Sequence, residues 1–106
     1  MSNSDRIKQI KMFLNDSPHD EFMNYALATE YIALGHDQEA LELFEKLVSM
    51  SPLYFATYYH LGKLYEKMGN TGSAISIYEK GLSVTKKLNE NHAYAELKGA
   101  YDALIY

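Results

Sequence analysis

Residues 17–50 read SPHDEFMNYALATEYIALGHDQEALELFEKLVSM, and residues 51–84 read SPLYFATYYHLGKLYEKMGNTGSAISIYEKGLSV. Aligned position by position, these two 34-residue stretches share ten identical residues. The identical pairs are Ser17/Ser51, Pro18/Pro52, Tyr25/Tyr59, Leu27/Leu61, Tyr31/Tyr65, Gly35/Gly69, Ala40/Ala74, Glu45/Glu79, Lys46/Lys80 and Ser49/Ser83. Similar residues fill many of the other positions, so the chain repeats itself with a period of 34 residues.

Each period predicts two amphipathic helices. In residues 27–34 the large apolar side chains recur three and four positions apart, as on one face of a helix. Gly35 follows, where the left-handed backbone that ends many helices suits glycine. A second apolar stripe covers 40–48, and Pro52 ends it because proline cannot donate the helical hydrogen bond. The second copy repeats this order, with Thr71 as the predicted N-cap of its second helix.

These features resemble the tetratricopeptide repeat: the period, a small residue after a leucine, a tyrosine three residues on, a later alanine and aromatic, and Pro52. The resemblance implies an all-α fold, a right-handed helical-repeat superhelix of about six helices in a single domain, 1–106. Its expected parts are a helix at 3–15 resembling half a repeat, repeats at 21–52 and 55–88, and a capping helix at 90–105.

The second copy departs from the family pattern at Lys86, which stands where Pro52 predicts a proline. Without that proline the last helix of the copy is expected to continue toward Leu88. The chain then breaks at residues 89–91.

The same resemblance implies a binding site. Proteins of this family bind peptides or partner helices along a concave face lined by the first helix of each repeat. On this chain the implied contact residues are Phe22, Tyr25, Thr29, Ile32, Tyr59, Lys63 and Glu66. A rigid, amphipathic tyrosine suits an interface, so Tyr25 and Tyr59 are the strongest candidates. The alternative is that these two rings only pack helix against helix, and the sequence leaves both readings open.

A specific mode in this family is a clamp for the two carboxylates of a chaperone tail. Its lysine and asparagine places fall here on Tyr25, Thr29 and His60. These side chains cannot supply the charge-assisted hydrogen bonds that a buried carboxylate needs. The expected ligand is therefore apolar or aromatic, with one basic contact at Lys63.

Composition argues against several other kinds of function. With no cysteine, disulfides and thiolate metal sites are excluded. No stretch approaches the roughly 18 apolar residues of a membrane span and no signal peptide is apparent, so no membrane role and a cytoplasmic location are expected. A net charge of −4 gives no reason to expect nucleic acid as a partner.

Catalysis and cofactors are not expected either. The four histidines, His19, His36, His60 and His92, are scattered and form no pair four residues apart on a helix, so no metal site is predicted. No serine, histidine and acid are brought together by the periodicity, and the expectation is a protein that is not an enzyme.

Two functions remain. The first is an adaptor that binds a peptide or helix of another protein in a short concave groove. The alternative is a structural or self-associating repeat protein without a peptide ligand, with the end helices as possible contacts in a homo-oligomer. It is suggested by charge asymmetry: residues 21–54 carry six acids and one base, whereas 55–88 carry five bases and two acids.

Overall fold

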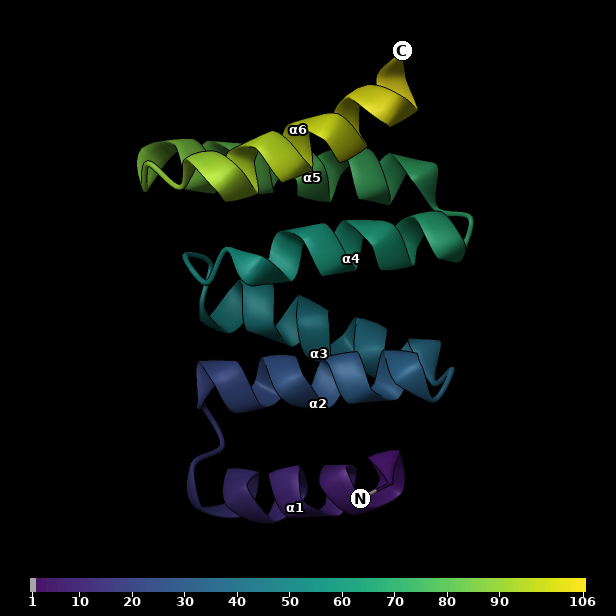
Figure 1. Cartoon of the computed structure of the whole chain (residues 1–106), viewed down its shortest axis with the longest axis vertical. Coiled ribbons are helices and arrows are strands. Elements are labelled where there is room, and N and C mark those ends of the chain that lie inside the picture. The colour runs from purple at the N-terminus through teal and green to yellow at the C-terminus, as the bar shows by residue number, and fades with distance from the viewer. Residues whose placement is uncertain (1) are drawn as a thin grey trace. The chain divides into compact units, whose positions relative to one another are not determined.

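The computed structural model describes residues 2–106 as six α-helices joined by short turns (Figure 1). The helices are α1 (Asn3–Asp16), α2 (Glu21–Ala33), α3 (Asp37–Met50), α4 (Ala56–Lys67), α5 (Thr71–Lys87) and α6 (Asn91–Ile105). Over this described part of the chain there is no strand, so the all-α prediction is confirmed. The chain forms two compact units, one up to Ser51 and one from Pro52 onward.

Local backbone chemistry explains where the helices end. Gly35 and Gly69 have positive φ angles of 76° and 79°, as predicted for residues that end α2 and α4. At the end of α5 the same left-handed place is taken by Asn89, with φ 58°. Because no proline stops it, α5 continues past Lys86 and is 17 residues long, whereas α3 has 14.

Side chains also cap helix starts. The Asp20 carboxylate accepts a hydrogen bond from the Met23 N–H at 2.8 Å, at the start of α2. The prediction that Thr71 caps α5 is wrong. The cap is Asn70, whose side-chain oxygen accepts from the Ser73 N–H at 3.1 Å, and Thr71 is the first helical residue. Both residue types can cap a helix, so the choice depends on where the preceding turn ends.

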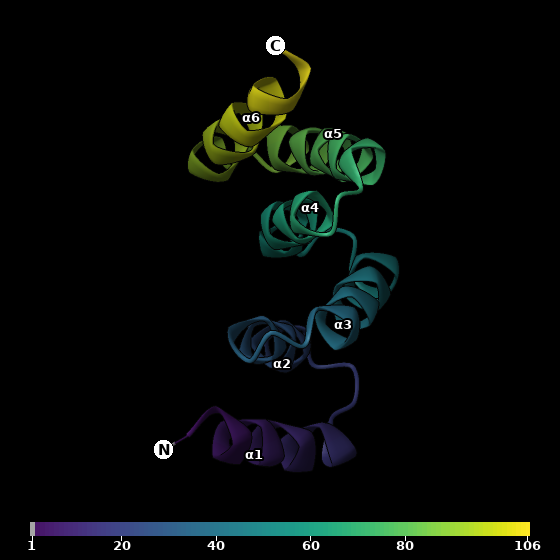
Figure 2. The same ribbon diagram turned by 90° about the vertical axis from the view of Figure 1, so that its right-hand side faces the viewer.

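In the first unit α2 packs between α1 and α3. Figure 2 shows α2 and α3 side by side. The turn that joins them contains Gly35. Ala28, Ala40 and Phe44 are completely buried. Ile7 and Ile10 of α1 join Leu27 in a second cluster. The apolar stripes predicted from the repeat therefore form the core of this unit.

In the second unit α5 packs against α4, and α6 packs against α5 and, less extensively, α4. The largest buried side chains are the rings of Tyr58 and Tyr78. Gly62 and Gly81 let the helices approach closely. A β-carbon at Gly62 would lie 2.1 Å from the Tyr78 ring, and one at Gly81 would lie 2.7 Å from the Tyr58 β-carbon.

Candidate functional site

The four contact residues predicted on α2 lie three and four positions apart, and we call Phe22, Tyr25, Thr29 and Ile32 the α2 face. Phe22 is 60% exposed, and the other three side chains are half-buried. Phe22 is therefore the residue of this face that offers the most accessible apolar surface to a ligand.

Tyr25 has a structural partner. Its ring meets Phe44 edge-on, with 6.3 Å between the ring centroids and 63° between the planes. Edge-to-face pairs of this kind stabilise packing beyond the area they bury. Tyr25 thus braces α2 against α3, as the packing interpretation predicts, and it is half-buried, so its role in binding stays a prediction.

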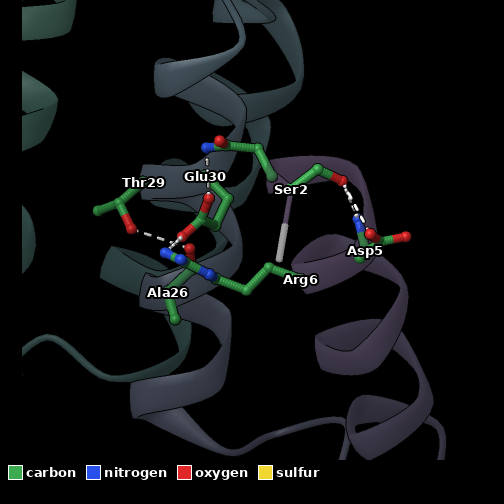
Figure 3. A network of polar contacts seen from close by, with 7 residues as sticks. Ser2, Asp5, Arg6, Ala26, Thr29 and Glu30 are labelled. Atoms are coloured by element: carbon green, nitrogen blue, oxygen red, sulfur yellow. Dashed lines mark hydrogen bonds and ion pairs between the residues drawn. The ribbon is translucent and has the colours of Figure 1, made fainter.

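Polar residues on and beside this face have internal roles. The Thr29 hydroxyl donates to the Ala26 carbonyl at 2.8 Å, as Figure 3 shows. The Glu30 carboxylate accepts from Arg6 Nη1 at 2.9 Å and from Asn3 Nδ2 at 2.7 Å. The Glu30 side chain is only 12% exposed. Glu30 therefore fastens α1 to α2, a role that sequence reasoning missed because the second copy has Leu64 at this place.

The equivalent α4 face carries Tyr59, Lys63 and Glu66. The Lys63 ammonium lies 5.6 Å from the centroid of the Tyr59 ring, a cation–π distance. It also lies 3.7 Å from Glu66 Oε2. Nearly half of the Lys63 side chain stays exposed, at 47%. The three predicted residues are thus brought together, with the cation held between a ring and a carboxylate.

Glu66 also accepts a hydrogen bond from a side chain of α5. The Tyr78 hydroxyl donates to Glu66 Oε2 at 2.5 Å. Burial raises the pKa of Tyr78 well above 10.0, and the hydrogen bond and the negative charge of Glu66 raise it further. Tyr78 therefore stays protonated as a donor, and the Glu66 carboxylate is partly used inside the fold.

Two further side chains of the second unit, His60 of α4 and Lys98 of α6, lie in different surroundings. The pKa of His60 is lowered by burial, and the nearby Glu96 of α6 raises it in part. The His60 ring meets the Tyr59 ring edge-on at 5.9 Å. Lys98 lies two positions beyond Glu96, on the other side of α6, where its ammonium pairs with Asp102 at 2.9 Å. Lys98 therefore does not join Tyr59 and Lys63.

The first unit has two surface depressions away from the α2 face. Two adjoining depressions of about 330 and about 270 Å³ both have Leu27, Leu43 and Lys46 in their walls. They lie where α1, α2 and α3 meet, and none of the predicted contact residues lines them. The α2 face is therefore a partly apolar surface outside these two depressions.

Membrane-spanning helices and metal-binding clusters are both absent from residues 2–106. No helix in this range has both the length and the apolar character needed to cross a membrane. Across the same range, no three side chains of histidine, cysteine, aspartate or glutamate are grouped so that they could hold a metal ion.

Comparison with known proteins identifies the repeat. The family model described as tetratricopeptide repeat matches residues 23–52 and 55–88. Two tetratricopeptide repeat-containing proteins of Methanocaldococcus jannaschii are 38% identical over 50 residues and 33% identical over 73 residues. These alignments cover 47% and 67% of this chain, but only 15% and 22% of those proteins.

Solved structures share the fold. A tetratricopeptide repeat domain protein from Salinibacter ruber is 41% identical, with a TM-score of 0.78, over 80% of this chain and 94% of that one. PcrH, solved in complex with the chaperone binding region of PopD, has a TM-score of 0.88 over 97% of this chain and 78% of its own. PcrH is 14% identical to this chain, so that likeness is one of fold.

Proposed function

This chain belongs to the tetratricopeptide repeat family, and from that premise we propose that it binds a peptide or a helix of another protein, with the α2 face and the α4 face each as a contact surface. Repeats of this family generally mediate protein–protein interaction. PcrH, which holds a region of PopD, is a precedent for this fold as a receptor for a segment of another chain.

The observation that carries the proposal is that each face has a tyrosine ring held in place by a contact within the fold. Tyr25 is braced by Phe44, and Tyr59 lies under the Lys63 ammonium. A ring that is already held loses little conformational entropy when a ligand binds. Phe22 adds exposed apolar surface beside Tyr25.

The same contacts indicate the chemistry of the ligand. Phe22, Tyr25 and Ile32 favour apolar or aromatic side chains. Lys63 is the cation of the α4 face, and its contact with Glu66 is long at 3.7 Å, so it can also pair with an acidic group of the ligand. We therefore propose that the α2 face contacts apolar side chains of the partner and that the α4 face contacts an acidic one.

Site-specific photo-crosslinking tests this surface. A photoreactive phenylalanine analogue at position 22 is expected to capture the partner in cells. The matched control is the analogue at position 53, because Leu53 is a similarly exposed apolar residue outside both faces, at 52%. Equal capture from both positions argues against the α2 face.

Titration calorimetry with the captured partner's segment then measures each face. Phe22→Ala and Lys63→Glu are each expected to weaken binding about tenfold, as for ordinary hot-spot residues, whereas Leu53→Ala leaves it unchanged. Unaltered affinity in the Phe22→Ala, Lys63→Glu double variant overturns the proposal.

A further inference from the structure

The two adjoining depressions of the first unit form one continuous groove, which we call the α1–α3 groove. It is lined by side chains within residues 11–18, 24–31 and 39–46, all in the same compact unit. The groove uses the side of α2 that carries Leu27 and Tyr31. At 3.6 residues per turn this side is roughly opposite the α2 face, so the two surfaces are separate.

The floor of the groove is apolar and belongs to the core. Leu14, Tyr31 and Leu43 are half-buried and pack against the buried cluster that contains Leu27. Side chains held by a close-packed core move little, so this floor is formed before a ligand arrives. With about 330 Å³ in the larger depression and about 270 Å³ in the smaller, the groove lies within the size range of ligand sites, roughly 300–1,000 Å³.

The charges of the groove are divided along its length. Among the described residues that line it, the larger depression has Lys11 and Lys46 and no carboxylate. The smaller depression has Glu39 and Glu42, and it shares Lys46 with the larger. The Lys11 ammonium lies 5.7 Å from the centroid of the Tyr31 ring, a cation–π distance that restrains this lysine at the groove. The groove therefore has a basic end and an acidic end.

Asn24 is a buried polar residue in the wall of the larger depression, and it is 3% exposed. Its Nδ2 donates to the Pro18 carbonyl at 3.1 Å and to the Asp20 carbonyl at 2.8 Å. Because both amide hydrogens are used, Asn24 can offer a ligand only the acceptor Oδ1. At the corresponding place of α4, the Tyr58 hydroxyl donates to the Pro52 carbonyl at 2.6 Å. Asn24 thus makes the corresponding contact with a smaller side chain and keeps an acceptor for a donor such as a peptide N–H.

We propose that the α1–α3 groove is a second docking site, for a short extended segment of a partner protein. The segment carries two apolar side chains two positions apart, with an acidic residue at one end and a basic residue at the other. Its apolar side chains lie on the leucine floor, and its acidic residue pairs with Lys11 and Lys46. Its basic residue pairs with Glu39 and Glu42, and a main-chain N–H donates to Asn24 Oδ1.

The length of the groove favours an extended segment over a helix. Asn24 and Tyr31 are seven residues apart on α2, which is about 10 Å along the helix axis. An extended chain covers this distance with about three residues, and its side chains two positions apart point to the same side. The N–H groups inside a helix are already bonded to its own carbonyls, so a helical ligand would have none for Asn24.

A phage-displayed library of random heptapeptides is the probe. Selection against the unmodified protein at low salt is expected to enrich peptides with two apolar residues two positions apart, between an acidic and a basic residue. A synthetic copy of an enriched peptide is expected to shift the NMR amide signals around Leu14, Leu27 and Leu43. Its affinity is expected to decrease with salt, because exposed ion pairs contribute to the contact.

Charge reversal tests the basic end. The Lys11→Glu, Lys46→Glu double variant is expected to bind the peptide about tenfold more weakly in titration calorimetry. A peptide with lysine in place of its acidic residue is expected to bind this variant more tightly than it binds the unmodified protein. The matched control is Lys8→Glu, Lys80→Glu, because both lysines lie outside the groove and Lys80 is the counterpart of Lys46 in the second repeat. All four lysines are exposed, so both variants are expected to fold, which circular dichroism checks.

Phe22→Ala separates this site from the α2 face, and it is expected to leave peptide binding unchanged. Selection that enriches no peptide of the stated pattern overturns the proposal. So does equal affinity in the groove variant and its matched control. Peptides that lose binding in Phe22→Ala and keep it in Lys11→Glu, Lys46→Glu bind the α2 face, which overturns the groove as a docking site and leaves the proposed function standing.

Discussion

The ring of Tyr78 lies directly against the α-carbon of Gly62, so that an added β-carbon would be 2.1 Å from the ring. Tyr78 is completely buried and its hydroxyl is held by Glu66. The ring therefore has no room to move aside. In the first repeat the corresponding residues are Ala28 and Phe44, which lack this combination of a bare α-carbon and a hydroxyl.

Gly62→Ala is expected to lower the free energy of unfolding by about 1–3 kcal/mol, the usual cost of overpacking a core. Urea denaturation measures it. Gly99→Ala on α6 is the matched control, because nothing lies within 4 Å of the added methyl group. In that helix, alanine is expected to raise the free energy of unfolding by up to about 1 kcal/mol. Equal effects at the two positions contradict the close contact.

Alkaline pH is expected to destabilise the second unit through its buried tyrosines. The pKa values of Tyr78 and Tyr58 are both raised from 10.0 by burial. Their protonated forms therefore stabilise the fold fully below pH 10. Above it the unfolded chain loses these protons first, and the free energy of unfolding falls by up to about 1.4 kcal/mol per pH unit for each tyrosine.

Tyr78→Phe tests the source of this pH dependence. Removing the hydroxyl is expected to make the decrease in the free energy of unfolding above pH 10 shallower by the contribution of one tyrosine. Urea denaturation at a series of pH values measures this. An unchanged slope in Tyr78→Phe excludes this residue as a source.

Mild acid is expected to destabilise the fold through His60. Its pKa is lowered from 6.5, mainly by burial, so the unfolded chain binds this proton more readily than the folded one. The free energy of unfolding should fall as pH decreases below 6.5. His60→Gln is expected to reduce that fall. Glu96→Gln should increase it, because Glu96 partly opposes the lowering of the pKa. If the free energy of unfolding depends on acid pH in the same way in the unmodified protein, His60→Gln and Glu96→Gln, this role of His60 is wrong.

Glu30→Ala is expected to loosen α1, because it removes the hydrogen bonds from Arg6 and Asn3. Hydrogen bonds to a charged group contribute about 1.5–3 kcal/mol, less here because the Arg6 side chain is exposed. Amide hydrogen exchange should become faster in α1 and stay unchanged in α4, which belongs to the other compact unit. Glu39→Ala, at a 51% exposed side chain, is the control. Protection of α1 that is unaffected by Glu30→Ala removes Glu30 as its anchor.

Much of the candidate site could be predicted from spacing. The residues of the α2 face share one side of a helix, and Tyr59, Lys63 and Glu66 do come together, because residues three and four apart are neighbours on any helix. What spacing could not predict is which of them already have partners. The Phe44 contact of Tyr25 and the Tyr78 contact of Glu66 join different helices, so they depend on how those helices pack.

Local sequence patterns were enough to predict the helices and where several of them stop. Backbone chemistry acts locally, so Gly35, Gly69 and the missing proline at Lys86 were enough to mark where helices stop. Three contacts are visible only in the packed molecule: Tyr78 crosses the bare α-carbon of Gly62, Glu30 anchors α1, and Lys98 lies away from Tyr59. Each of these depends on the distance and rotation between two helices. That distance and that rotation are determined by the packing of side chains far apart in the sequence, so no local sequence pattern predicts them.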